Sequence, residues 1–368
     1  MAVSARNSRN MGLDILRAMA MFLVIVLHFV GQGGLLSHAV EGSVKYWLLS
    51  AVQIVAFCCV NLYGLTTGYL MCDKAFRLSR VVKLWATTLF WSVAVSCVLF
   101  VIFPESWTMK EMVSMFFPLL RGRYWFFTAY FVVMMVSPAL NLLIRNLTVG
   151  QYRLLLAALF LVFGVIPVGA LGNDVLRIST GHHFSWLIVL YLIGGYFKKT
   201  EQVRAASPRK YLAGFFLFAA VHLLYRILTT AVGLGNFSNL LLTYPSPVVV
   251  GEAICLFLYC KDAFAEVSDR SIPGKLIRFA APGVYSVYVI HVHPQVYWKP
   301  EILNLFRAWD SWNAPAVLGA MMVTAAAVFV VCVCLDAVRQ RLFRCLGIDK
   351  ALEKLSDRTE ACVRKHIL

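Results

Sequence analysis

One apolar stretch near the start of the chain carries three ionisable side chains, and this combination constrains the fold most. Residues 11–30 are hydrophobic enough to enter a bilayer, yet they include Asp14, Arg17 and His28. An ionisable group at membrane depth costs at least ~2.5 kcal/mol, so such groups usually face a bundle interior and mark a functional site. Arg17 and His28 are about three helical turns and about 16 Å of rise apart, while Asp14 can pair with Arg17. The sequence therefore predicts a polar stripe along the inner face of a transmembrane helix.

The rest of the chain repeats apolar stretches of similar length. Of its 368 residues, 60% are hydrophobic and only 14% are charged, whereas roughly a quarter of an ordinary soluble domain is charged. This composition predicts an all-α fold, a polytopic membrane helix bundle of about ten transmembrane helices. The predicted spans are near residues 11–30, 46–71, 81–103, 124–144, 154–171, 184–197, 211–233, 240–260, 280–298 and 314–336. The stretch 104–120 is too short and too polar to span, and we expect an external interfacial helix there.

The formal net charge of +16 is distributed in a way that fits a membrane protein rather than a nucleic-acid-binding protein. With the N-terminus inside, the predicted cytoplasmic segments hold 25 of the 34 Lys and Arg residues. This excess follows the positive-inside rule and predicts that both termini are cytoplasmic. We expect a multi-pass protein of the plasma or inner cell membrane, with the lipid bilayer as its surroundings and no nucleic-acid partner.

The chain is expected to hold one membrane domain, residues 1–336, and a cytoplasmic basic amphipathic tail, residues 337–368. None of the ten cysteines falls in a predicted external loop, so no disulfide framework is indicated. The adjacent His182 and His183 fall in a predicted external loop without supporting ligand spacing. We therefore expect no metal site.

Several polar residues are further candidates for a site. Arg77 and Arg80 follow the second predicted span, and on one helix face they could hold phosphate oxygens bidentately. Taken alone, however, ordinary positive-inside charge also explains them. His291 and His293 are two residues apart and should point to different faces, so both cannot easily enter one site, and we expect His293, before Pro294, at a helix end.

A second group of buried polar residues has two interpretations. His222 and Arg226 are one turn apart in one predicted span and could pair with Glu252 in the next. A structural polar clamp is one interpretation, and a substrate-binding role for Glu252 is the other. Trp125 likewise fits either an interfacial aromatic belt or a substrate contact.

Together these residues resemble the membrane acyltransferase-3 family, which carries an Arg-x10-His signature in its first helix. The other similarities are to a Phe-Phe-x-x-Ser-Gly-Phe-Leu element at the end of the second helix, an Arg-x-x-Arg pair, a Trp-Phe helix start and a late Tyr-Leu-Ile-His segment. At positions 66 and 67 the chain has Thr where the family usually has Ser. The corresponding residues here, in family order, are Asp14-x-x-Arg17-x10-His28, 62–70 (LYGLTTGYL), Arg77-x-x-Arg80, 123–127 (RYWFF) and 286–291 (SVYVIH).

The resemblance implies an O-acetyltransferase that moves an acyl group from cytosolic acyl-CoA to a hydroxyl of an envelope polysaccharide or lipid-linked glycan. CoA is then a co-substrate, acetyl-CoA in the usual case, and no cofactor is bound permanently. In this scheme His28 is the general base, and Arg17, oriented by Asp14, stabilises charge on the thioester oxygen or positions CoA. Arg77 and Arg80 would hold the CoA phosphates. Trp125, Glu252 and His291 are candidate substrate-binding residues.

Two other functions are compatible with the same residues. A transporter or flippase could use buried His, Arg and Glu side chains as a proton relay. A membrane domain of the same fold could instead have lost catalysis and serve as a partner or sensor. An acyl-CoA thioester cleavage assay that depends on a glycan acceptor separates these alternatives from the acyltransferase.

Overall fold

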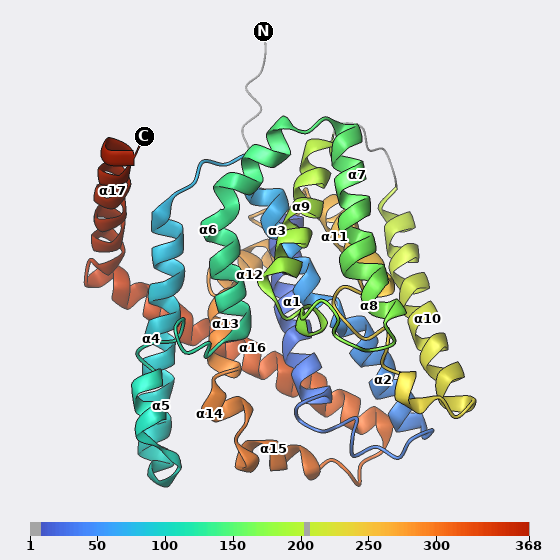
Figure 1. Cartoon of the computed structure of the whole chain (residues 1–368). Helices are drawn as coiled ribbons and strands as arrows, with labels where there is room; N and C mark the ends of the chain where they lie inside the picture. The colour runs from blue at the N-terminus through green and yellow to red at the C-terminus, as the bar shows by residue number, and fades with distance from the viewer. Residues whose placement is uncertain (1–8, 202–206, 368) are drawn as a thin grey trace.

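The computed structural model describes residues 9–201 and 207–367, and in this part of the chain the secondary structure is helical, with no strand. Seven segments are long and apolar enough to cross a membrane. Figure 1 shows them packed as one bundle, which confirms the predicted polytopic α-helical fold. The segments are α1 (Met11–Val30), α2 with α3 (Val44–Phe57 and Cys59–Met71), α4 (Leu78–Ile102), α6 (Trp125–Asn146), α7 with α8 (Val149–Phe160 and Ile166–Gly169), α10 (Pro208–Ala231) and α16 (Ala314–Cys345).

The other three predicted spans are not among these seven segments, and two of them are shortened or interrupted. The predicted span 184–197 is α9 (Phe184–Lys199), which has 16 residues. The span expected over 240–260 begins only at Pro247, as α11 (Pro247–Ala263), because proline fits the first helical turn. The span expected over 280–298 is two helices, α13 (Val284–His291) and α14 (Pro294–Tyr297), which Pro294 separates in the same way.

Four more α-helices lie in the described chain. The predicted interfacial helix within 104–120 is reduced to α5, six residues long, which begins at a capping box formed by Thr108 and Glu111. The other three are one short helix before α13, one after α14 and one at the end of the described chain. The four helices are α5 (Met109–Ser114), α12 (Ile272–Ala280), α15 (Pro300–Arg307) and α17 (Ile348–Ile367).

Helix α1 lies at the centre of this bundle and contacts α2, α3, α11, α13 and α16 (Figure 1). Apolar side chains on several of its faces, such as Leu16, Ile25 and Val30, have no measurable exposure. A helix that is apolar and buried on most sides is expected at the core of a membrane bundle. The ionisable residues of α1 are therefore carried by a central helix, in which Asp14 is buried and Arg17 and His28 are partly buried.

Helices α3 and α9 approach each other closely at glycines. A Cβ atom on Gly68 would lie 1.9 Å from the Tyr191 backbone oxygen, and one on Gly194 would lie 2.1 Å from the Leu65 oxygen. Small residues at such crossings let two membrane helices pack backbone to backbone. The Gly-rich segment 62–70 is therefore used for helix packing.

The C-terminal part is continuous with the bundle. Helix α16 runs past the predicted domain boundary at 336/337, and at this point Asp336 is fully buried. Its carboxylate accepts hydrogen bonds from Trp91 Nε1 at 3.0 Å and Arg339 Nε at 2.6 Å. The boundary therefore lies within a helix that is fixed to α4.

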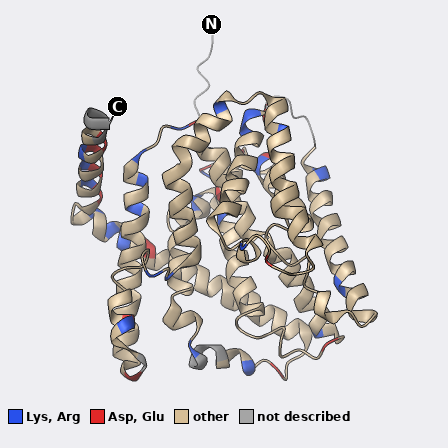
Figure 2. Cartoon of the chain, viewed as in Figure 1, with Lys and Arg blue, Asp and Glu red and all other residues tan. Residues whose placement is uncertain are grey.

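Helix α17 packs along the start of α4, beside which it stands in Figure 1. Lys83 Nζ lies 2.6 Å from Glu353, and the Glu360 carboxylate accepts a hydrogen bond from the Leu78 amide at 2.5 Å. Most of the ribbon in Figure 2 is uncharged, and Lys and Arg lie mainly toward the two ends of the bundle and along α17.

Candidate functional site

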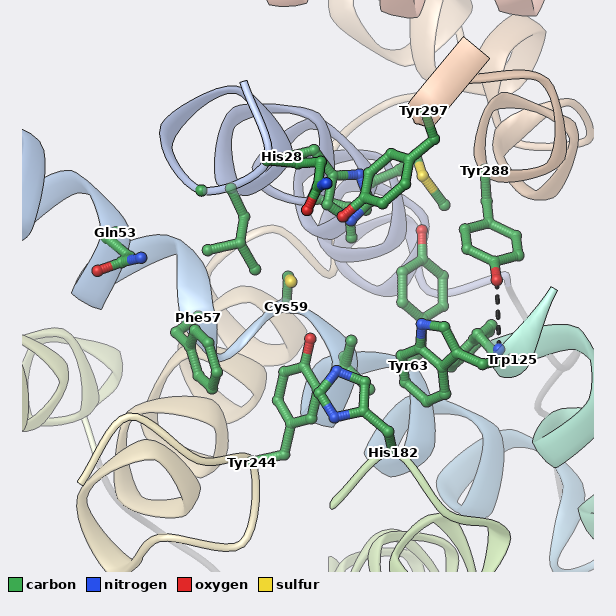
Figure 3. Close-up of a pocket in the computed structure, with 17 residues that line it drawn as sticks. His28, Gln53, Phe57, Cys59, Tyr63, Trp125, His182, Tyr244, Tyr288 and Tyr297 are labelled. Atoms are coloured by element: carbon green, nitrogen blue, oxygen red, sulfur yellow. Dashed lines mark hydrogen bonds between the residues drawn. The ribbon is translucent and has the colours of Figure 1, made fainter. Parts of the chain in front are cut away.

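His28, in the last turn of α1, lines a cavity of about 250 Å³ inside the bundle. In Figure 3, His28 and Tyr297 face Tyr244 and His182 across this space, and Trp125 and Tyr288 lie at one side. The turn at Cys58 between α2 and α3 brings Phe57 and Cys59 to its wall. The remaining lining residues are Met21, Val24, Leu27, Gly31, Gln32, Gln53, Val60, Tyr63 and Phe126.

A histidine pair sets the chemistry of this cavity. His28 Nδ1 lies 3.1 Å from His291 Nε2, and His291 Nδ1 lies 2.6 Å from the Val287 backbone oxygen. Because a carbonyl oxygen only accepts, the hydrogen of neutral His291 is assigned to Nδ1 and its Nε2 accepts from His28 Nδ1–H. Neutral His28 then carries a lone pair on Nε2, which suits a general base.

His293 has a different role from His291, as their spacing predicts. It is fully buried, and its Nε2 lies 3.0 Å from both Ser96 Oγ and Arg123 Nη2. Its Nδ1 accepts from the Gln295 amide at the start of α14. His293 therefore caps the start of α14 and fixes it to α4.

An aromatic wall encloses His28. The His28 and Tyr297 rings meet edge to face with centroids 4.8 Å apart. On the other side, His182 contacts Trp125 at 4.6 Å and Tyr244 at 4.9 Å between ring centroids. Burial lowers the pKa of His182, which keeps it neutral near pH 7. The sequence predicted that His182 lies in an external loop and gave it no functional role. In the structure it lines the cavity.

Tyr288 offers a hydrogen-bond donor to the same cavity. Its buried hydroxyl accepts a hydrogen bond from the Phe126 amide at 3.2 Å, as Figure 3 shows. An oxygen that accepts from a backbone amide keeps its own hydrogen for donation. Tyr288 can therefore donate to an oxygen atom bound in the cavity.

Arg17 lines a second cavity, of about 280 Å³, nearer the start of α1. Asp14 lies 3.8 Å from Arg17 Nη1, and its other carboxylate oxygen accepts a hydrogen bond from Arg9. Asp14 is thus the shared partner of two guanidinium groups, and its pairing with Arg17 is confirmed. Arg17 and His28 lie on one helix but face separate cavities.

Three side chains form the septum between these two cavities. Met21, Tyr63 and Phe126 line both of them, and the Tyr63 hydroxyl donates to the Arg17 backbone oxygen at 2.8 Å. Because the same side chains form the floor of one cavity and the roof of the other, moving them joins the two. A molecule that contacts both Arg17 and His28 must pass between them.

A third cavity, of about 480 Å³, continues toward the start of α1 and shares Leu70 and Lys74 with the second. Its other charged lining residues are Arg9, Asp14, Asp73, Lys198 and Glu201. Burial raises the pKa of Glu201, but hydrogen bonds from Tyr69 and Lys198 outweigh it and lower the pKa overall. The three cavities follow α1 from its charged N-terminal end to His28.

A family model described as an acyltransferase domain, that of the acyltransferase-3 family, matches residues 10–337. The chain belongs to the acyltransferase-3 family. No curated protein and no solved structure matches the chain. The matched region contains both histidines of the pair and every lining residue of the three cavities except Arg9, so the site lies within the acyltransferase domain.

The arginine pair of this acyltransferase-3 protein does not share a helix face, contrary to the prediction. Arg77 is the exposed, extended residue before α4, because the helix begins only at Leu78. Arg80 Nη1 lies 3.2 Å from the Ala75 oxygen. Neither residue lines the three cavities, whereas Lys74 lines two of them.

The predicted polar clamp of this acyltransferase-3 protein is formed in part. His222 Nδ1 lies 3.7 Å from Glu252 Oε1, and both side chains are fully buried. Arg226 does not pair with Glu252; it donates instead to Gln53 Oε1 at 2.8 Å. Since Gln53 lines the His28 cavity, Arg226 fixes part of its wall, whereas Glu252 does not line that cavity.

Of the candidate substrate-binding residues, Trp125 lines the cavity and His291 contacts His28. In the described part of this acyltransferase-3 protein, no group of three His, Cys, Asp or Glu side chains could hold a metal ion. The site offers imidazoles, phenols and an indole for its chemistry.

Proposed function

We propose that this acyltransferase-3 protein transfers an acetyl group from cytosolic acetyl-CoA to a hydroxyl of an envelope polysaccharide or lipid-linked saccharide, in the plasma or inner membrane. The observation that carries the proposal is the His28–His291 pair in a cavity reached by a line of further cavities from the charged end of α1. The family match favours acyl transfer over a transporter.

The proposed reaction is direct transfer with His28 as general base. The acceptor oxygen attacks the thioester carbonyl carbon while His28 Nε2 takes the hydroxyl proton. The carbon–sulfur bond then breaks, and the departing CoA thiolate takes the proton from the His28 imidazolium. The products are the O-acyl ester, CoA thiol and neutral His28, so the enzyme is ready for another cycle.

Two side chains support this step. The His28 Nδ1–H hydrogen bond to His291 becomes charge-assisted when His28 is protonated, and it is therefore stronger in the transition state. The Tyr288 hydroxyl is the candidate donor to the developing oxyanion, because its own hydrogen remains available. We therefore assign His291 to positioning and Tyr288 to oxyanion stabilisation.

The donor is proposed to enter from the charged end of α1. Lys74 lines two consecutive cavities there, and Arg17 lines the inner one, so both can contact the anionic or polar parts of CoA. Arg77 and Arg80 remain candidates for the CoA phosphates at the mouth, outside the cavities. The pantetheine arm then crosses the septum and brings the thioester to His28. In this arrangement Arg17, held by Asp14, positions CoA.

The proposal is tested with purified protein in nanodiscs, acetyl-CoA and a saccharide extract of the cell envelope. CoA thiol release that depends on the saccharide is expected from the wild type. His28→Ala should lower it by roughly 10²–10⁴-fold, the range for general-base catalysis, while acetyl-CoA still binds. His38→Ala, which removes an exposed histidine paired with Asp310, is the matched control. Equal thiol release from wild type and His28→Ala would refute the proposal.

A further inference from the structure

A large apolar groove, separate from the aromatic cavity, also reaches His28. It has a volume of about 730 Å³ and lies between α1, the α13–α15 segment and α16. Phe29, Phe306 and Trp309 line one part of it, and Val328, Val331 and Leu335 line the other. Its volume is in the range of specific ligand sites.

The groove and the cavity meet at the histidine pair. His28, Gln32 and Tyr297 line both spaces, and His291 lines the groove. The polar end of the groove is therefore the proposed reaction centre, and its walls beyond that point are almost wholly aliphatic or aromatic. The combined space suits a molecule with a polar head and a hydrocarbon chain.

The groove lies along a helix whose outer face is expected to contact lipid. It runs along α16, a helix long and apolar enough to span the membrane, and neighbouring side chains such as Val323 and Val330 are 70% and 57% exposed. Apolar side chains on the outer face of a transmembrane helix contact lipid chains. A molecule that enters the groove therefore comes from within the bilayer.

We propose that the groove binds the hydrocarbon anchor of a lipid-linked saccharide and presents a hydroxyl of its head group to His28. This inference rests on the proposed function and narrows it, because it selects a membrane-embedded acceptor over a free polysaccharide. The donor takes the other route, since the charged cavities lie on the opposite side of the septum. Donor and acceptor thus reach His28 from different sides.

Photolabelling tests this assignment. The probe is a hexadecyl glucoside with a terminal diazirine, applied to the protein in nanodiscs, and adducts on α16 are mapped by mass spectrometry. Val331→Trp fills the groove. Val330→Trp is the matched control, because Val330 lies outside the groove and is 57% exposed, against 56% for Val331. Ala327 also lines the groove, so Ala327→Phe is a second variant that fills it.

Wild-type adducts are expected at groove-lining residues, and unlabelled hexadecyl glucoside should compete with the probe. Both filling variants should lower the adducts at least fivefold, with unchanged acetyl-CoA binding, and Val330→Trp should match the wild type. Equal labelling by a diazirine phosphatidylcholine without competition by the glucoside would mean that ordinary lipid fills the groove. Competition by palmitoyl-CoA but not by the glucoside would assign the groove to a long donor chain. Either result overturns the inference.

The two proposals fail separately. His28→Ala should retain the glucoside adducts on α16, because it changes only the polar end of the groove and leaves the apolar walls intact, while it loses acyl transfer. If His28→Ala keeps full transfer, the proposed function is wrong even where labelling succeeds. If transfer depends on His28 but the groove stays unlabelled, only the acceptor assignment is wrong.

Discussion

Replacing His291 tests the role of the histidine pair. In the resting state the 3.1 Å bond between His28 Nδ1 and His291 Nε2 joins two neutral groups, and such a bond contributes about 1 kcal/mol. When His28 takes the acceptor proton, the same bond has a charged donor and contributes about 1.5–3 kcal/mol. The difference, about 0.5–2 kcal/mol, is the extra stabilisation of the transition state. His291→Phe should therefore lower kcat about 2- to 30-fold, since about 1.4 kcal/mol is tenfold.

The assay is steady-state CoA thiol release in nanodiscs, with acetyl-CoA and acceptor varied separately. Because His291 does not line the cavities of Arg17 and Lys74, the KM for acetyl-CoA should stay unchanged in His291→Phe. His291→Gln keeps an acceptor oxygen and should recover most of the lost kcat. A full kcat in His291→Phe, or no recovery with Gln, would refute the assigned hydrogen-bond direction.

Three further predictions follow from individual contacts. Lys74→Ala should raise the KM for acetyl-CoA about tenfold with little change in kcat, because a charged hydrogen bond contributes about 1.5–3 kcal/mol; an unchanged KM would contradict its place on the donor route. Gly68→Ala places a methyl group 1.9 Å from the Tyr191 oxygen, and such overpacking costs about 1–3 kcal/mol, so the Tm in detergent should fall. A hydrogen bond from Lys83 lowers the pKa of Glu353. The contact between α17 and α4 is therefore strongest at a pH above the usual carboxyl pKa, and it weakens as the pH falls through the lowered pKa of Glu353. Hydrogen exchange of α17 should then rise at low pH, and a pH-independent rate would count against this contact.

Much of the fold could be predicted from the sequence because bilayer thickness fixes the length of an apolar helix. The first helix and its Asp14–Arg17 pair were predicted correctly for this reason. The ends of the helices near 240–260 and 280–298 were not, because Pro247 and Pro294 begin new helices rather than being tolerated inside longer ones. Hydropathy averaged over a window does not detect such breaks.

The candidate site was predicted only where its residues share one helix. The contact between His28 and His291 joins residues 263 positions apart, and no spacing rule detects it. The family resemblance selected His291 but gave it no partner. Arg17 and His28 share one face of α1 as predicted, yet the septum that separates their cavities includes Tyr63 and Phe126 from other helices.

His182 was missed because its position depends on loop conformation. The Asp174 carboxylate accepts from the amides of Ile178 and Ser179, both at 2.8 Å, and Thr180 has a φ of 55°. These contacts turn the chain back toward the bundle and bring His182 against Trp125. The sequence signal was only a short Asp- and Ser-containing segment, which is typical of many surface loops.

The most direct test of the central claim is a cryo-EM structure of the protein with a non-hydrolysable ketone analogue of acetyl-CoA. We predict the nucleotide at the charged end near Lys74, the pantetheine arm across the septum formed by Met21, Tyr63 and Phe126, and the carbonyl carbon in the cavity beside His28. An analogue whose carbonyl stays outside that cavity, with the septum still closed, would contradict the account.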